Sequence, residues 1–313
     1  MDRLVQAWPE LRYETWKSTA TTLHLWTQIV GKVRLSLTPW LNHGWHVALY
    51  ISARGLTTSP IPVDNEIFEI EFDFISQRLI ARTSRGDERS FQLEPQTVAE
   101  FYRRTLDLLD TVGVNVTIND TPNEVPDPIS FPEDRLHSEY DGEAAHRFWR
   151  ALISVDRVFK LFRSGFLGKA SPVHFFWGSF DLAVTRFSGR TAPRHPGGIP
   201  GLPDPITREA YSHEVSSAGF WPGNDAYPEA GFYSYAYPEP SGFRDRAVTR
   251  GARFDTDLGE FLLPYETVRR AQDPDALLLD FLSTTYAAAA NAGNWDRAAL
   301  ECPLGAPRQV RQV

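Results

Sequence analysis

Residues 171–190, SPVHFFWGSFDLAVTRFSGR, place one histidine, one aspartate and two arginines among five aromatic side chains. In an unbroken strand, His174 and Asp181 would face opposite sides, because successive side chains alternate. A glycine inside a strand often marks a bulge, and an extra residue at Gly178 would bring His174 onto the face of Asp181. We therefore predict an acid–base histidine that is oriented by a carboxylate. A core strand whose polar groups are hydrogen-bonded structurally is the other interpretation.

A second histidine and carboxylate occur in residues 208–223, REAYSHEVSSAGFWPG. On a strand, Tyr211 and His213 share one face, whereas Glu214 points to the other. An imidazole and a carboxylate supply general acid–base chemistry or metal ligands, so His213 and Glu214 join the catalytic candidates. A strand with one solvated polar face is the competing interpretation.

Two further histidines, His43 and His46, are three residues apart on either side of Gly44 and Trp45. On a loop that enters a strand they would form part of a divalent metal site. Zinc usually takes three protein ligands, and the spacing does not select a third among the remaining candidates. Those candidates are His174, Asp181, His213 and Glu214. The sequence has no H-E-x-x-H motif, phosphate loop or dinucleotide fingerprint.

Other side chains suit substrate binding. Arg54 and Arg186 would hold an anionic group through forked hydrogen bonds, with His46 beside them. Trp177 and Tyr235 would form an aromatic wall, and the Pro/Gly-rich residues 189–206 would form a lid. Along residues 66–74, the acidic side chains of Glu69, Glu71 and Asp73 share one strand face. We expect that face to be solvated, with a cation site as the alternative.

The composition narrows the class of protein. The 313 residues carry a net charge of −8, which argues against nucleic-acid binding and against adsorption to an anionic membrane. One cysteine, Cys302, allows no intrachain disulfide. The N-terminus lacks the apolar run of a signal peptide, and no apolar stretch reaches the about 20 residues that span a bilayer. We expect a cytoplasmic protein with a small-molecule ligand and an undetermined oligomeric state.

Hydrophobic spacing predicts four main helices, over 14–30, 95–112, 143–166 and 273–292, with Asp273 as an N-cap. Alternation predicts strands over 44–54, 66–74, 172–188, 211–221 and 231–237, a hairpin after residue 74 and a strand at 113–118. The fold class is α+β, with antiparallel sheets flanked by these helices. The chain divides into two halves around a central cleft, and the halves are either related by duplication or unrelated. The expected divisions are an N-terminal half at 1–118, a Pro-rich linker at 119–140, a C-terminal half at 141–301 and a flexible tail at 302–313.

Four long segments carry a resemblance to a known family. They are WPELRYETWKSTATTLHLWTQIVGK, LNHGWHVALYISARGLTTSPIP, EAYSHEVSSAGFWPG and FYSYAYPEP. Together with residues 171–190 they resemble a widespread bacterial family that is catalogued as a domain of unknown function. The resemblance runs from about Trp8 to Trp295. It implies one full-length unit and transfers no catalytic residue. The segments that carry it also contain most of the candidate site residues, which favours a site over a core.

We therefore hold two main hypotheses. In the first, the protein is an enzyme that acts on a small polar or anionic molecule by His/carboxylate acid–base chemistry in a central aromatic-lined cleft. In the second, the same cleft belongs to a non-catalytic ligand-binding or regulatory protein. A scaffold with an exposed apolar patch is a third. An enzyme requires two titratable groups within hydrogen-bond reach of each other.

Overall fold

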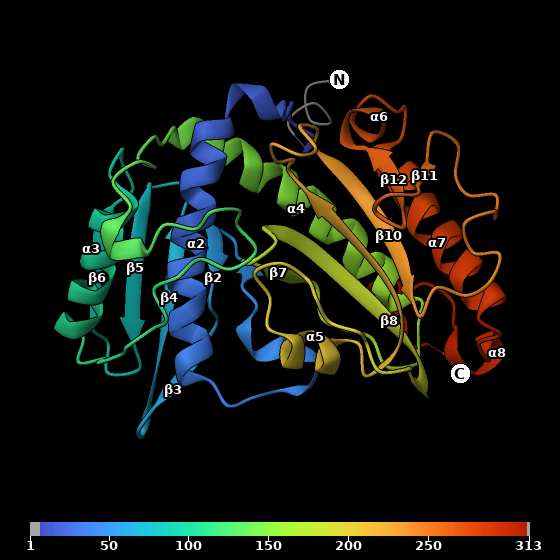
Figure 1. Cartoon of the computed structure of the whole chain (residues 1–313), viewed down its shortest axis with the longest axis horizontal. Coiled ribbons are helices and arrows are strands. Elements are labelled where there is room, and N and C mark those ends of the chain that lie inside the picture. Colours follow the sequence, from blue (N-terminus) through green and yellow to red (C-terminus); the bar gives the residue numbers. More distant parts are fainter. Residues whose placement is uncertain (1–6, 312–313) are drawn as a thin grey trace.

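The computed structural model describes residues 7–311, which fold into two antiparallel sheets with helices packed against them (Figure 1). This arrangement confirms the predicted α+β class. Within the described residues, none of the helices combines the length and the apolarity needed to cross a membrane. Residues 1–6 of the predicted N-terminal half and residues 312–313 of the predicted tail lie outside the described part.

The first sheet has the strand order β1-β2-β4-β5-β6, and β3 also pairs with β4. The alternation that predicted β4 is confirmed, because Phe68, Ile70 and Phe72 are all at most 1% exposed. The β5–β6 hairpin turns at Gly86, whose φ of 92° favours glycine. The strands are β1 (Tyr50–Ile51), β2 (Gly55–Thr57), β3 (Ile61–Val63), β4 (Glu66–Asp73), β5 (Arg78–Thr83) and β6 (Glu88–Gln92).

The second sheet has the order β11-β12-β10-β9-β8-β7, and all of its pairs are antiparallel. It meets the first sheet where Leu49 and Phe175 exchange two backbone hydrogen bonds of 2.9 Å. Its strands are β7 (His174–Phe176), β8 (Asp181–Thr191), β9 (His213–Trp221), β10 (Gly231–Tyr237), β11 (Arg253–Asp255) and β12 (Glu260–Pro264).

The four predicted helices are all present, and the largest difference in their bounds is at the end of the first, which continues to Leu37. Asp273 caps the last long helix as predicted, because its carboxylate accepts a 3.0 Å hydrogen bond from the Ala276 N–H. The α-helices are α2 (Lys17–Leu37), α3 (Val98–Thr111), α4 (Gly142–Ser164), α5 (Asp204–Ala210), α6 (Tyr265–Arg269), α7 (Pro274–Ala292) and α8 (Arg297–Leu300). The 3₁₀ segments are η1 (Tyr13–Thr15), η2 (Asn42–Val47) and η3 (Phe131–Glu133).

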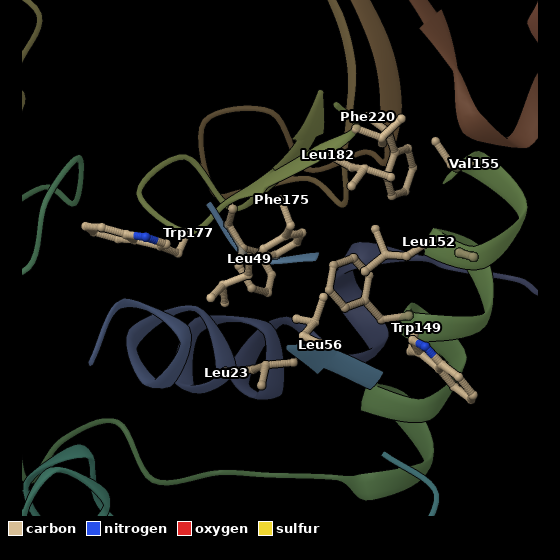
Figure 2. Close-up of a cluster of buried hydrophobic side chains, with 14 of the residues drawn as sticks. Leu23, Leu49, Leu56, Trp149, Leu152, Val155, Phe175, Trp177, Leu182 and Phe220 are labelled. Carbon is tan, nitrogen blue, oxygen red and sulfur yellow. The ribbon is translucent and has the colours of Figure 1, made fainter. Parts of the chain in front are cut away.

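One continuous buried cluster joins both sheets. Helix α4 contacts β1 and β2 of the first sheet and β8 of the second. Leu56, Leu152 and Phe220 accordingly share this cluster (Figure 2), although they come from the first sheet, α4 and the second sheet. Aromatic pairs such as Trp26 on Phe101, with ring centroids 4.5 Å apart, contribute large buried surfaces. The division into two halves stays a prediction, since residues of both lie in this core.

Three segments differ from expectation. Residues 44–54 do not form one strand, because His43 and Gly44 both have positive φ, of 60° and 69°, and the chain turns through η2 before β1. Residues 113–118 join neither sheet. The Pro-rich residues 119–140 include η3 and the fully buried Phe131. In each case a local conformation or tertiary packing overrides the strand or linker pattern.

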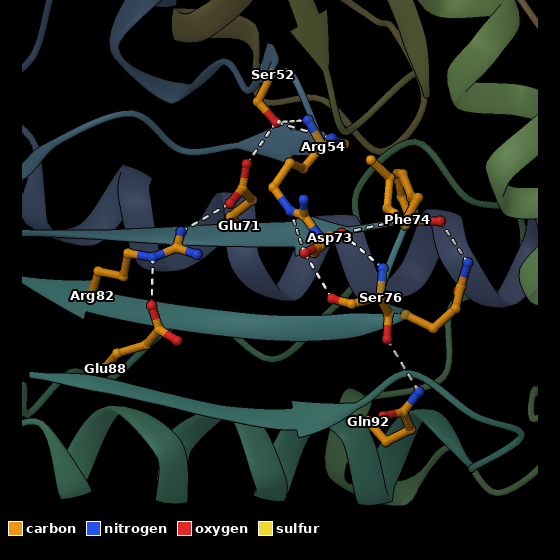
Figure 3. Close-up of polar contacts among 12 residues, drawn as sticks. Ser52, Arg54, Glu71, Asp73, Phe74, Ser76, Arg82, Glu88 and Gln92 are labelled. Carbon is orange, nitrogen blue, oxygen red and sulfur yellow. Dashed lines mark hydrogen bonds and ion pairs between the residues drawn. The ribbon is translucent and has the colours of Figure 1, made fainter.

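The expected solvated face of β4 is wrong at its C-terminal end, where Glu71 is 8% and Asp73 1% exposed. Figure 3 shows the network that holds them: the Ser52 hydroxyl and an Arg82 N–H donate to Glu71 at 2.7 and 2.8 Å. Arg54 donates to Asp73 at 2.6 Å. Buried carboxylates are stable when donors satisfy them, so these two are structural.

Candidate functional site

The second sheet carries a polar face that is covered rather than solvated. Across β8, β9 and β10, the backbone register aligns Thr185 with Ser217 and Ser217 with Tyr235. The hydroxyls of Thr185 and Ser217 are 2.8 Å apart, and Tyr233 precedes Tyr235 by two residues on the same face. We call this surface, which contains Asp181, Thr185, Ser217, Tyr233 and Tyr235, the tyrosine face.

The tyrosine face begins at Asp181, where β8 leaves a tight turn at residues 177–180. The predicted bulge in a single strand is wrong, because β7 and β8 are separate antiparallel strands joined by that turn. The register nevertheless pairs His174 with Ala183, two residues from Asp181, so His174 and Asp181 do lie on one face. Asp181 is 5% exposed and accepts hydrogen bonds from the Ser179 and Tyr233 hydroxyls. It does not bond to His174.

Two further carboxyl groups, Glu124 and Glu260, lie near Asp181. Burial raises the pKa of Asp181 to about 6, against the lowering effect of its hydroxyl donors. Burial, with the Asp181 charge adding to it, raises the pKa of Glu124 to about 7 and that of Glu260 to about 8. Among residues 7–311, neither glutamate side chain has an ion-pair or hydrogen-bond partner. We call Glu124, Asp181 and Glu260 the carboxyl cluster.

Tyr211 lies among these three carboxyl groups. Its hydroxyl is 2.8 Å from that of Tyr235. Burial is the main reason that its pKa rises to about 12, and the charges of Glu260, Asp181 and Glu124 add to the rise. Tyr211 follows α5, which contacts η2 and lies beside the β7–β8 edge of the second sheet in Figure 1. The Tyr211 side chain therefore joins the segment that follows α5 to the tyrosine face through Tyr235.

The cover is the segment 192–211, which contains the predicted lid from residue 192 onward, because residues 189–191 belong to β8. His195 stacks on Tyr211 with ring centroids 5.0 Å apart and also contacts Tyr237. The Asn123 amide donates a 3.0 Å hydrogen bond to the Gly201 carbonyl. A Cβ at Gly201 would lie 2.6 Å from the backbone nitrogen of Glu124, and its φ is 72°, so only glycine allows this approach. The cover thus closes directly on the carboxyl cluster.

The other end of the sheet face is basic. The His43 ring lies 5.6 Å from that of His213, and its Nε2 lies 2.5 Å from the Lys169 ammonium. Burial, followed by the Lys169 charge, lowers the pKa of His43. Lys169 also faces the rings of Trp45 and Phe187. The predicted partners His213 and Glu214 do not meet, because Glu214 faces the opposite side of the strand and pairs with Arg190 at 2.6 Å.

His174 is enclosed by aromatic rings. It is 1% exposed, and its ring lies 5.5 Å from Tyr50, 5.8 Å from Trp45 and 5.4 Å from Phe176. Burial lowers its pKa to about 3, and Arg34 and Arg163 contribute. Neither ring nitrogen has a hydrogen-bond partner among the described residues. The imidazole is therefore neutral at pH 7 and is placed without the carboxylate that the sequence suggested.

The two predicted anion-binding arginines lie away from the tyrosine face. Arg54 lies in the turn between β1 and β2 of the first sheet and pairs with Asp73. Arg186 is 4% exposed, and its guanidinium carbon lies 3.6 Å from the Phe162 ring centroid and 4.4 Å from that of Tyr286. It donates to the Phe162 carbonyl at the end of α4. Both guanidinium groups are thus committed to structural contacts.

His43 and His46 do not form a metal site with a third residue. His46 is 1% exposed, accepts a 3.3 Å hydrogen bond from the Leu41 N–H, and packs on Trp40. His43 instead faces Lys169. Over the described part of the chain, no three His, Cys, Asp or Glu side chains are close enough to hold one ion.

Trp177, predicted as a wall of the site, is packed between helix and turn. It is 6% exposed, and its indole N–H donates a 2.8 Å hydrogen bond to the Val47 carbonyl. Its ring fills the space next to Gly31 of α2, where an added Cβ would lie 2.2 Å from a ring atom. The close contact explains the glycine within a long helix.

This contact gives a first prediction. Gly31→Ala should lower the free energy of unfolding by about 1 to 2 kcal/mol, because the overlap with the ring outweighs alanine's better helix propensity. Urea unfolding measures the change. In the background of Trp177→Leu, which vacates the space, the same Gly31→Ala substitution should instead stabilise the protein. An equal effect in both backgrounds would contradict the contact.

The model of a family of unknown function, DUF5996, matches residues 8–302. The chain belongs to this family. The match is essentially full length and confirms the resemblance in the sequence. Searches of curated proteins and of solved structures find no match.

Sequence reasoning missed three polar residues that this DUF5996 chain brings to the site: Glu124, Lys169 and Glu260. Glu260 begins β12 after a turn at Gly259, and the segment EFLLP carried a detectable strand signal. Glu124 lies in an irregular Pro-rich stretch, and nothing in its neighbours indicates a site. Lys169 precedes the strand by several residues, so only the fold brings it to His43.

Proposed function

We propose that this DUF5996 protein is an enzyme that acts on a small polar molecule by general acid–base catalysis. The observation that carries the proposal is the carboxyl cluster, in which the buried Asp181 and the half-buried Glu124 and Glu260 lack basic partners and have pKa values raised to about 6, 7 and 8. Burying carboxyl groups in this way is unfavourable for folding, and strongly perturbed groups gather at functional sites. Near pH 7 the cluster holds an ionised base and a protonated acid together.

Within the cluster, the roles follow from the surroundings. Asp181 has the lowest pKa, and the Tyr233 and Ser179 hydroxyls donate to it, which favours its ionised form. We assign it as the base or nucleophile. Glu260 has the highest pKa and no donor among the described residues, so we assign it as the acid. Because such groups titrate together, the values belong to the cluster as a unit.

The side chains of the tyrosine face favour a sugar-like substrate. The rings of Tyr211, Tyr233 and Tyr235 stack on His195, on Trp221 and on one another, and their hydroxyls gather with those of Thr185 and Ser217. Aromatic faces with polar tips bind ring-shaped, polyhydroxylated molecules through stacking and hydrogen bonds. Glycoside hydrolysis uses two carboxyl groups in these acid and base roles. We therefore propose a small glycoside as the substrate.

Entry to the site requires the cover to move. Three contacts hold the segment 192–211 in place. The His195 ring packs on Tyr237, the Asn123 amide donates to the Gly201 carbonyl, and the Tyr237 hydroxyl donates a 3.0 Å hydrogen bond to the Pro193 carbonyl. Gly197 and Gly198 have positive φ of 85° and 80°, which gives the segment backbone freedom at its middle. Loops of this kind open for substrate and exclude water when they close.

The proposal is tested with a panel of 4-nitrophenyl glycosides. Wild-type protein should hydrolyse at least one of them with a bell-shaped pH profile between about pH 6 and pH 8. Asp181→Asn should lower kcat/KM by about 10³-fold or more, because the base is lost while the shape is kept. Glu214→Gln is the control, since Glu214 lies on the opposite side of the strand, and it should retain the wild-type rate.

A wild-type protein that turns over no glycoside at any pH contradicts this reaction class. If isothermal titration then shows a sugar bound in the same site, the alternative of a non-catalytic ligand-binding or regulatory protein is favoured. Either function is proposed for the cytoplasm, which suits the free thiol of Cys302. The same charge balance of −8 favours a small-molecule ligand over nucleic acid or a membrane.

A further inference from the structure

We infer that a second site, at the C-terminal end of α4, binds a phosphate group, either free or as the monoester of a small molecule. A hollow of about 430 Å³ opens there, within the usual size range of small-molecule sites. It shares no lining residue with the carboxyl cluster, so it does not rest on the proposed hydrolysis. Its lining residues are Arg163, Ser164, Phe166, Gly168, Lys169, Ala170 and Arg311.

The charge of this hollow is entirely positive. Arg163, Lys169 and Arg311 line it, and no acidic side chain does. None of these three cations forms an ion pair within residues 7–311, whereas many other arginines of the chain pair with carboxylates. In a chain with a net charge of −8, such a group of cations produces a local positive potential that attracts anions.

The end of α4 does not cancel this potential. A helix C-terminus carries partial negative charge on its free carbonyls, which would repel an anion. Here the Phe162 carbonyl accepts from Arg186, and the Ser164 carbonyl accepts from Arg311. These two guanidinium groups neutralise the helix end, and Arg163 and Lys169 remain as uncompensated charge.

The donors that remain are suited to phosphate. The Arg163 Nε–H donates a 2.6 Å hydrogen bond to the Ser171 carbonyl. This bond fixes the guanidinium and leaves its two terminal nitrogens available to a ligand. Lys169 uses one N–H toward His43 and has two more. The Nε of Arg311 is buried without a partner among the described residues. A guanidinium group and an ammonium group together bind tetrahedral oxyanions such as phosphate. Phe166 provides an apolar wall for an organic group attached to the phosphate.

Isothermal titration with inorganic phosphate and with phenyl phosphate, at constant ionic strength set with chloride, tests the inference. We expect one saturable site in the wild type. Arg163→Gln and Lys169→Gln should each weaken binding by about tenfold or more, because each removes charge-assisted hydrogen bonds. Lys160→Gln is the matched control, since Lys160 is exposed on the same helix and pairs with Asp156. Melting temperatures close to wild type would show that the variants fold.

The two probes separate the sources of the phosphate group. Tighter binding of phenyl phosphate indicates a monoester that uses the Phe166 wall, and equal binding indicates free phosphate. An NMR shift of the His43 imidazole on titration, with the distant His137 unchanged, places the ligand next to Lys169. No saturable binding above the chloride background, or binding that both glutamine variants retain in full, would overturn the inference.

Discussion

Replacing Arg186 by alanine is expected to lower the free energy of unfolding by about 3 to 5 kcal/mol, although the residue looks like a ligand-binding arginine in the sequence. Its guanidinium lies within 5 Å of the centroids of three aromatic rings, those of Phe162, Phe166 and Tyr286. Alanine would leave a cavity between β8 and α4 and would remove one of the two donors to the Phe162 carbonyl. Urea unfolding measures the loss.

The control for this prediction is Arg186→Met. Methionine keeps most of the volume but not the charge, and the Phe162 carbonyl still accepts from the Gly165 N–H at 3.1 Å. Replacement of a buried charge by an apolar group of similar size is often near neutral, so we expect a loss of about 1 to 2 kcal/mol, from the cation–π contacts. Near-wild-type stability of Arg186→Ala, together with loss of phosphate binding, would make Arg186 a ligand contact instead.

Arg186 also illustrates what the sequence can predict. The long helices follow from their apolar spacing and from caps such as Asp273, because these signals are local. Strands in which apolar and polar residues alternate without a break, such as β4, can also be predicted from the sequence. The strand expected at 44–54 fails because the consecutive positive φ values at His43 and Gly44 are a tertiary outcome with a weak sequence signal.

The candidate site was harder to predict, for a physical reason. Period-two alternation assigns His213 and Tyr235 to faces correctly, but it puts His174 and Asp181 on opposite faces because the turn between β7 and β8 interrupts the strand. It also says nothing about which residues from other segments cover those faces. Glu124 and Tyr211 reach Asp181 only through the packing of the cover. Arg54 and Arg186 were interpreted from residue type, and their carboxylate and aromatic partners lie far away in the chain.

The carboxyl cluster gives the second large prediction, a pH-dependent difference between Glu260→Gln and wild type. The folded-state pKa of Glu260 is raised from 4.5 to about 8, mainly by burial. Between these values the unfolded chain has released the proton and the folded protein still binds it. Ionisation therefore favours unfolding progressively as the pH rises from about 4.5, and the penalty is complete above about pH 8. Glutamine stays neutral and avoids this penalty.

Measuring the difference between variant and wild type removes the contributions of buried groups outside the carboxyl cluster. His24, whose pKa burial lowers to about 4, and Lys32, whose pKa burial lowers to about 8, titrate in both proteins alike. Glu260→Gln should match wild type at pH 4.5 and exceed its free energy of unfolding by about 2 to 4 kcal/mol at pH 9. Glu214→Gln, which breaks an ion pair instead, should show no such gain.

The same variant separates a functional origin of the cluster from a structural one. If Glu260 serves folding, its removal should destabilise the protein at every pH, because a structural carboxyl group would be satisfied by donors that glutamine cannot replace. If it is kept for catalysis, removal should stabilise the protein while abolishing turnover, which is the usual trade-off at active sites. Destabilisation at pH 9 would remove the main support for the carboxyl cluster as an acid–base centre.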